Sequence, residues 1–180
     1  METNDATRLI KHRRLNAVRK TQWADLGCGT GFFTNVLSSF LAAGSTLYAI
    51  DTNPAALKKV KVADGITLKR QELNFVTGEW PFKKIDGIMM ANSLHYVPGK
   101  NVFIEKLKHH LDTKGCVLII EYDMSTPNAW VPYPIGYSAL EILFTVAGFT
   151  NVEKIHQVLS AFGRANIYAA IAGMQAFIRS

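Results

Sequence analysis

The sequence has few of the residues and segments that mark secreted, membrane or metal-binding proteins. It contains only two cysteines, Cys28 and Cys116, which give neither a disulfide framework nor a metal-ligand spacing. Its longest apolar runs, such as residues 116–120, are much shorter than a membrane span. The first residues, METNDATRLIKHRR, include no apolar segment of the kind found in secretory signals. We therefore expect a cytoplasmic protein without a metal site or a membrane contact.

Acidic residues are absent from residues 8–20, which hold six Lys and Arg side chains of a chain with a formal net charge of +6. This basic segment predicts either a solvated amphipathic helix or a contact with RNA phosphates. No aromatic residue lies among residues 8–20 to stack on bases, which favours the solvated helix. With 180 residues, 48% of them hydrophobic, we expect one domain over residues 1–180, with residues 1–20 as its basic helical segment.

Apolar runs alternate with helical patterns along the chain, which is typical of parallel strands covered by helices. The expected strands are residues 22–26, 46–51, 66–70, 84–91 and 116–122. Two further strands near 149–158 and 165–172 are separated only by the segment LSAFGRA. A connection this short predicts a hairpin, so the last strand should run antiparallel to its neighbour.

The expected helices begin and end at recognisable signals. After the glycines at 27–31, apolar residues recur with helical spacing up to Gly44, where that helix should stop. Asn53 followed by Pro54 predicts another helix start, and residues 100–111 have one apolar face. Ser138 with Glu141 forms a capping-box pattern, which predicts a helix that ends at Gly148.

Three glycines, Gly27, Gly29 and Gly31, follow the first expected strand and need a physical reason, because a fixed glycine costs backbone entropy. Asp51 ends the second expected strand about 20 residues later, where a carboxylate can accept both hydroxyls of an adenosine ribose. Phosphate binding is disfavoured, since residues 24–37 include no basic side chain and the glycine spacing is not G-x-G-x-x-G. Asp25 just before the glycines suits a cofactor that carries positive charge.

These segments resemble the class I S-adenosylmethionine-dependent methyltransferases. The resemblance rests on DLGCGTG, YAID, WPFKKIDGIMMANSLHYV and GCVLIIEY, and it covers residues 21–158. It implies an α/β fold with a Rossmann-like, doubly wound sheet of seven strands, mostly parallel with an antiparallel last strand. It also implies S-adenosylmethionine as the cofactor.

The resemblance further implies which residues bind the cofactor, all of them at the carboxyl ends of strands. The glycine loop would contact the methionine and ribose part, Asp51 the ribose hydroxyls, and Thr52 the adenine. The family usually has an aspartate in its third-strand motif, whereas this sequence offers Glu72 or Asn74 there. The implied cofactor-binding residues are Asp25, Gly27, Cys28, Gly29, Thr30, Asp51, Thr52, Glu72, Leu73 and Asn92.

Methyl transfer depends mainly on aligning the acceptor atom and excluding water, and it needs a general base where the acceptor carries a proton. His95, three residues after Asn92, is the best-placed titratable group for that role, and Tyr96 follows it. We expect both as catalytic residues. An aromatic surface with polar tips should face the substrate, made of Tyr96, Tyr122, Met124, Trp130, Tyr133 and Tyr137.

We therefore expect a methyltransferase that modifies an oxygen or nitrogen atom of a small molecule. No Asn/Asp-Pro-Pro-Tyr/Phe sequence is present, which disfavours enzymes that methylate the exocyclic amines of adenine and glutamine. About 20 residues precede the first strand and leave little room for a lid, so the pocket should be open or completed by a second subunit of a homodimer. The alternatives are an RNA methyltransferase that uses the basic segment, and a non-catalytic domain that binds S-adenosylmethionine.

Overall fold

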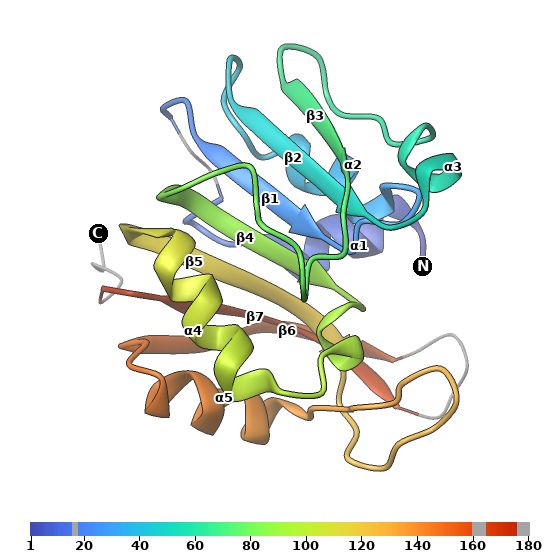
Figure 1. Ribbon diagram of the computed structural model, residues 1–180, viewed down its shortest axis with the longest axis vertical. Coiled ribbons are helices and arrows are strands. Elements are labelled where there is room, and N and C mark those ends of the chain that lie inside the picture. The colour runs from blue at the N-terminus through green and yellow to red at the C-terminus, as the bar shows by residue number, and fades with distance from the viewer. Residues whose placement is uncertain (16–17, 160–164, 176–180) are drawn as a thin grey trace.

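A twisted sheet of seven strands runs through the protein, with helices on both of its faces (Figure 1). The computed structural model describes residues 1–15, 18–159 and 165–175. None of the helices within these ranges combines the length and the apolar character that crossing a membrane needs. In chain order the elements are α1 (Thr3–Ile10), β1 (Gln22–Leu26), α2 (Phe32–Ser38), β2 (Thr46–Asp51), α3 (Pro54–Leu57), β3 (Thr67–Glu72), β4 (Ile85–Ala91), η1 (Leu94–Tyr96), α4 (Lys100–His110), β5 (Leu111–Tyr122), α5 (Tyr137–Val146), β6 (Asn151–Leu159) and β7 (Asn166–Gly173).

The strands lie in the order β3-β2-β1-β4-β5-β7-β6. The first five of these run parallel to one another, whereas β7 runs antiparallel to both β5 and β6. This confirms the expected Rossmann-like sheet with an antiparallel last strand; most of the connecting segment LSAFGRA (160–164) lies outside the described residues. The strand order reverses between β1 and β4, and sheets of this kind bind ligands beyond the carboxyl ends of the strands at that point.

Successive side chains of each strand pack toward opposite faces of the sheet. In β4, Ile88 and Met90 belong to the core cluster that includes residues of α4 and α5, whereas Met89 belongs to the cluster that includes residues of α1 and α2. All three side chains are fully buried. Figure 1 shows α4 and α5 in front of the sheet and α1 and α2 behind it. The central parallel strands are therefore covered on both sides, which explains their almost continuous apolar sequence.

Helix α2 is shorter than its sequence pattern predicts. It ends at Ser38 rather than near Gly44. The chain continues in tighter turns, in which the N–H of Phe40 donates to the carbonyl of Leu37 (3.0 Å). The apolar spacing thus continues past the helix because these turns still direct side chains into the core.

Helix α5 begins differently from the expectation. Its first residue is Tyr137 and its N-cap residue is Gly136, which has no side chain to cap the helix. The predicted capping box of Ser138 and Glu141 is therefore wrong. The N–H of Tyr137 donates instead to Oδ1 of Asp123, at 2.9 Å. An acceptor that follows β5 therefore stabilises the start of this helix.

The N-terminal segment packs on the sheet rather than extending from it. Helix α1 buries Ala6, Leu9 and Ile10 completely, and Leu15 beyond it is also fully buried. These side chains share a core cluster with residues of α2, β5 and β7. Only residues 3–10 of the expected helical segment 1–20 form a helix, and the described residues 11–15 and 18–20 follow in turns and bends, so the prediction of a helix over the whole segment is wrong. Residues 1–15 are nevertheless an integral part of the fold.

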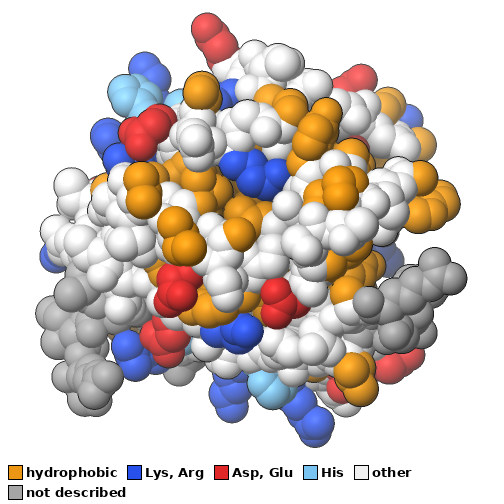
Figure 2. Space-filling model, turned by 90° about the horizontal axis from the view of Figure 1, so that it is seen from below, with side chains coloured by type: hydrophobic (Ala, Val, Ile, Leu, Met, Phe, Trp, Pro, Cys, Tyr) orange, Lys and Arg blue, Asp and Glu red, His pale blue; other side chains and the backbone are white. Residues whose placement is uncertain are grey.

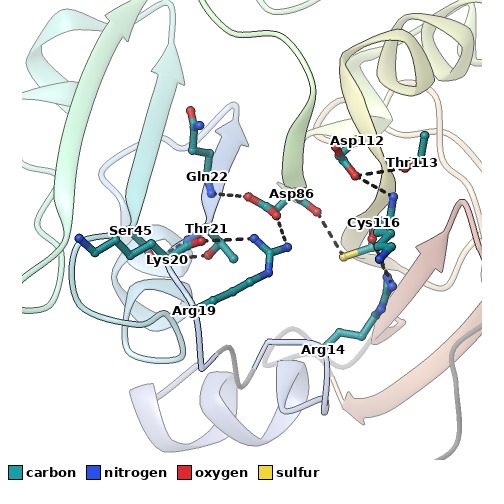
Figure 3. Close-up of polar contacts among 11 residues, drawn as sticks. Arg14, Arg19, Lys20, Thr21, Gln22, Ser45, Asp86, Asp112, Thr113 and Cys116 are labelled. Carbon is teal, nitrogen blue, oxygen red and sulfur yellow. Dashed lines mark hydrogen bonds and ion pairs between the residues drawn. The ribbon is translucent and has the colours of Figure 1, made fainter.

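Arginines of the basic segment bind the amino ends of β4 and the start of β5 (Figure 3). Arg19 donates to Oδ1 of Asp86 (2.5 Å), whose other carboxylate oxygen accepts from the N–H of Gln22 (2.8 Å). Arg14 donates twice to the carbonyl of Lys114 (3.1 and 3.2 Å). Arg19 is exposed and Arg14 is half-buried, and both connect the N-terminal segment to the strand ends that lie farthest from the ligand-binding edge.

Figure 2 shows the end of the molecule that carries α5 and the segment between β5 and α5. Hydrophobic side chains lie there in several groups, and more of them surround a hollow near the centre of the view. On α5, Leu140 and Phe144 are buried, whereas Ile142 and Val146 point outward and are 64% and 82% exposed. Helix α5 thus contributes both to the core and to the apolar surface of this end.

Candidate functional site

The three glycines form the loop between β1 and α2, and all have positive φ angles of 78°, 53° and 86°. A Cβ atom on Gly27 would lie 2.7 Å from the Cβ of Ser93, and one on Gly31 would lie 2.8 Å from the Cγ1 of Val60. Both positions therefore require glycine for packing as well as for conformation. A Cβ on Gly29 would meet no atom of the described residues within 4 Å. Gly29 is thus the position at which a ligand can approach the backbone.

Asp51, at the end of β2, connects the glycine loop to the next helix. Its Oδ2 accepts from the N–H of Gly29 (2.8 Å), and its Oδ1 accepts from the N–H of Asn53 (2.9 Å). Asn53 in turn caps α3 with its side chain, as the sequence predicts. Each carboxylate oxygen keeps a second lone pair, so Asp51 can also accept bonds from two hydroxyl groups of a ligand. Thr30 and Thr52 lie exposed next to this loop and this strand end.

Asp25 lies below the glycine loop and is only 1% exposed. Thr34 donates to its Oδ2 (2.6 Å), while its Oδ1 has no hydrogen-bond partner among the described residues. Burial raises the pKa of Asp25 to about 7, with a smaller contribution from the charge of Asp51. Burial, together with the charges of Asp25 and Asp51, also raises the pKa of the Cys28 thiol far above its usual value, so Cys28 stays protonated and is no nucleophile.

The end of β3 contributes one exposed carboxylate. Glu72 is exposed, and the N–H of the next residue, Leu73, donates to the carbonyl of Asp51 (3.0 Å). Asn74, the other candidate in this segment, uses its side-chain oxygen to accept two main-chain N–H groups that follow it (2.9 and 3.3 Å). The side-chain oxygen of Asn74 is therefore occupied by its own turn, whereas Glu72 is exposed at the end of β3, in register with Asp51.

Asn92 occupies a backbone conformation that few residues other than glycine adopt. Its φ is 53°, and its N–H donates to the carbonyl of Ile120 (2.8 Å). The side-chain oxygen is buried and has no hydrogen-bond partner among the described residues. Asparagine tolerates this conformation better than most residues, and such outliers gather at functional sites.

Two cavities meet at Asn92 and Tyr122, which line both of them. The smaller cavity, of about 500 Å³, is also lined by Met1, Glu2, Asp5, Phe32 and Phe33. The larger cavity, of about 900 Å³, is also lined by His95, Tyr96, Met124, Asn128, Trp130 and Val131. Four residues of the expected aromatic surface thus face the larger cavity, whereas Tyr133 and Tyr137 are not among the described residues that line it. No pattern in the sequence indicates that the first residues of the chain line the smaller cavity.

His95 is nearly buried, at 3% exposure, and binds a carboxylate that is buried even more deeply. Its ring Nδ1 lies 2.7 Å from Oε2 of Glu121, and its main-chain N–H donates to Oε1 of the same residue (3.1 Å). The ring of Tyr96 lies 4.3 Å from that of His95 between centroids, and Tyr96 is 53% exposed. The sequence expectations above do not include Glu121; the signal that points to it is that it is the one acidic residue in the apolar run CVLIIEY.

The segment between β5 and α5 is attached to the rest of the site through main-chain atoms. Lys100 donates to the carbonyls of Tyr133 (2.7 Å) and Val97 (2.9 Å). The N–H of Tyr133 donates to the carbonyl of His95 (3.0 Å), and Asn128 closes a local turn by accepting two main-chain N–H groups (2.8 and 2.9 Å). These bonds hold the residues that line the larger cavity against η1.

The sequence matches a family model described as a methyltransferase domain over residues 24–117. This range begins within β1 and ends in β5, so it includes the glycine loop, Asp51 and His95. No curated protein has a significant match to the chain.

Several solved structures share the fold. A S-adenosylmethionine-dependent methyltransferase from Aquifex aeolicus has a TM-score of 0.61 and 19% identity, with 97% of this chain and 100% of that chain covered. The 1,6-didemethyltoxoflavin-N1-methyltransferase of Burkholderia thailandensis, with bound 1,6-didemethyltoxoflavin and S-adenosylhomocysteine, has a TM-score of 0.69 and 18% identity, covering 95% and 77%. The magnesium protoporphyrin IX methyltransferase of Synechocystis, with bound S-adenosylmethionine, has a TM-score of 0.62 and 14% identity, covering 87% and 71%.

Proposed function

The chain belongs to the class I S-adenosylmethionine-dependent methyltransferases, and on this basis we propose that it methylates an oxygen or nitrogen atom of a small molecule bound in the larger cavity. The observation that carries the proposal is the position of the segment after β4. Ser93 donates to the carbonyl of Leu26 (2.6 Å) just before the glycine loop, while its neighbours Asn92 and His95 line the cavity. A cofactor on the loop and an acceptor in the cavity would therefore share one wall.

S-adenosylmethionine supplies a methyl group on a positively charged sulfur, and the residues at the carboxyl ends of the strands fit such a cofactor. Gly29 leaves room at the backbone, and Asp51 has lone pairs for the ribose hydroxyls. Glu72 and the main chain of Leu73 would accept from the adenine amine. The unbonded Oδ1 of Asp25, with its raised pKa, suits a cationic group, because a nearby positive charge favours the ionised carboxylate. Contacts from the neighbouring residues would complete this set, namely Gly27, Cys28, Thr30, Thr52 and Asn92.

The lining of the larger cavity supports an acceptor with a flat, unsaturated part. Tyr96, Tyr122 and Trp130 offer aromatic faces, and Trp130 is 81% exposed at present, so a ligand could cover much of its ring. The structurally similar enzyme that contains 1,6-didemethyltoxoflavin also acts on a small molecule. His95 would serve as the general base and Tyr96 would help to place the acceptor.

An RNA acceptor is less well supported by the basic segment. Arg14 and Arg19 bind atoms at the amino end of the sheet, next to Lys114 and Asp86. Strand β4, with 7 residues, separates Asp86 from the segment of His95, which is a distance of roughly 20 Å at the usual rise of a strand. RNA phosphates held by these arginines would lie at the opposite end of β4 from the cavity.

The test is release of S-adenosylhomocysteine by the purified protein with fractionated metabolite pools and, separately, with total RNA. We expect turnover with a small-molecule fraction. Turnover with RNA alone would show that the protein is an RNA methyltransferase instead. Tight cofactor binding without turnover in any pool would indicate a non-catalytic binding domain.

A pair of variants links the activity to the cavity. Trp130→Ala should raise the KM for the acceptor while cofactor affinity stays unchanged, because Trp130 lines only the larger of the two cavities. Val102→Ala is the matched control, since Val102 is 79% exposed on α4 and lines neither cavity. Equal kinetics for both variants would place the acceptor elsewhere.

A further inference from the structure

Glu121 is a buried carboxylate whose two oxygens both bind one residue. It is 1% exposed and directly follows the buried apolar residues 116–120 of β5. Oε1 accepts from the N–H of His95, and Oε2 contacts ring Nδ1 at 2.7 Å. A buried carboxylate is costly unless it is paired or hydrogen-bonded, so the position of Glu121 depends on His95 and that of His95 depends on Glu121.

The carboxylate decides where the imidazole proton lies. An ionised carboxylate can only accept hydrogen bonds, so the ring nitrogen at 2.7 Å must carry the hydrogen. In the neutral ring the other nitrogen, Nε2, then has a free lone pair. No described residue makes a hydrogen bond to Nε2, and His95 lines the larger cavity.

From this geometry, and resting on the proposed function, we propose that Glu121 is a positioning residue for methyl transfer. It holds His95 in the tautomer with hydrogen on Nδ1, so that Nε2 can take a proton from the acceptor. When a hydroxyl acceptor reacts, its O–H bond breaks and the proton moves to Nε2. The acceptor oxygen forms a bond to the methyl carbon, and the electron pair of the broken carbon–sulfur bond stays on sulfur. The resulting imidazolium is paired with the Glu121 carboxylate.

The structure predicts a specific effect of Glu121→Gln. The N–H of His95 can only donate, so the amide oxygen of glutamine must face it, as Oε1 does now. The amide NH₂ group then faces Nδ1 and donates to it. This arrangement makes Nδ1 the acceptor and moves the ring hydrogen to Nε2, which can no longer accept a proton. The variant should therefore keep its fold and lose its base.

The first experiment measures the tautomer directly. The full chain is labelled with ¹⁵N-histidine, and the nitrogen shifts are recorded at a pH at which imidazole rings are neutral. His95 is assigned among the five histidines by comparison with His95→Gln. We expect the hydrogen on Nδ1 in the native protein and on Nε2 in Glu121→Gln. The hydrogen on Nε2 in the native protein would overturn the proposal, and this measurement does not depend on how the variant folds.

The second experiment measures turnover with an acceptor found by the screen described above. Glu121→Gln should lower kcat by about 10²–10⁴-fold, the usual contribution of a general base, with cofactor affinity unchanged. Glu105→Gln is the control for removing a carboxylate, because Glu105 is an exposed residue of α4 paired with Lys108 (3.2 Å). Full activity of Glu121→Gln with a reversed tautomer would overturn the role of Glu121. A different outcome would overturn the proposed function itself. If the native protein has its hydrogen on Nδ1 as expected but His95→Gln is fully active, His95 is not the base.

Discussion

Cofactor binding should depend on pH through Asp25. This carboxyl group has a pKa raised to about 7 by burial, and its Oδ1 has no hydrogen-bond partner among the described residues. A cationic group of the cofactor near Oδ1 favours the ionised form, so at low pH the cofactor must first displace a proton. Affinity should then rise with pH up to about 7 and level off above it.

The size of the effect follows from the pKa. A group with a pKa of about 7 is ionised to about one-eleventh at pH 6 and to about ten-elevenths at pH 8, so the dissociation constant should fall about tenfold between these pH values, or about 1.4 kcal/mol. Calorimetry in buffers with different ionisation enthalpies should also show that binding at pH 6 releases a proton.

Asp25→Asn is the matched control, because it keeps the shape of the side chain and the partner Thr34 while it removes the titration. Any titration of the cofactor itself is common to both proteins and cancels in the comparison. The native protein should also lose thermal stability relative to Asp25→Asn as pH rises from about 4 to about 7, and the difference should level off above 7, because between the ordinary pKa of 3.8 and the raised pKa the folded state binds a proton that the unfolded state has released. A pH profile of binding that is the same in both proteins would refute the role assigned to Asp25.

Three further predictions concern other parts of the protein. Asp51→Ala should weaken cofactor binding by at least about 1.5–3 kcal/mol, the contribution of one charged hydrogen bond. It should also lower Tm, because the carboxylate holds the N–H groups of Gly29 and Asn53. Unchanged affinity by calorimetry in the folded variant would mean that the ribose binds elsewhere. Tyr96→Phe should lower kcat less than His95→Ala does, with cofactor affinity unchanged in both, and equal turnover of both variants and the native protein would show that the loop after β4 is only structural. Arg19→Gln should cost less than about 1 kcal/mol in a denaturant titration, as usual for an exposed ion pair, and should leave methyl transfer unchanged; a salt-dependent loss of activity would instead support RNA binding.

The sequence predicts those parts of the site that depend on local chemistry. The glycine loop, the Asn53 cap and the acid at the end of β2 are defined by residues close together in the chain, and the structure places them at one edge of the sheet. The contact between His95 and Glu121 joins residues 26 positions apart, on segments whose register only the folded sheet determines. The start of α5 could not be predicted for the same reason, because Asp123, 14 residues earlier, provides its acceptor.

The attachment of the segment between β5 and α5 has a consequence for how acceptor specificity can change. Tyr133 is held by its own carbonyl and N–H, through Lys100 and the carbonyl of His95, and the Lys100 ammonium also lies 5.7 Å from the centroid of its ring. Side chains on this segment, such as those of Met124 and Trp130, can therefore be exchanged while these anchoring bonds persist. A laboratory library confined to residues 124–131, with Asn128 kept for its turn, would search new acceptors while the cofactor residues and the His95–Glu121 pair stay intact. Because the residues that line the acceptor cavity are distinct from those that anchor the segment and bind the cofactor, related enzymes could change their substrate by ordinary point mutation.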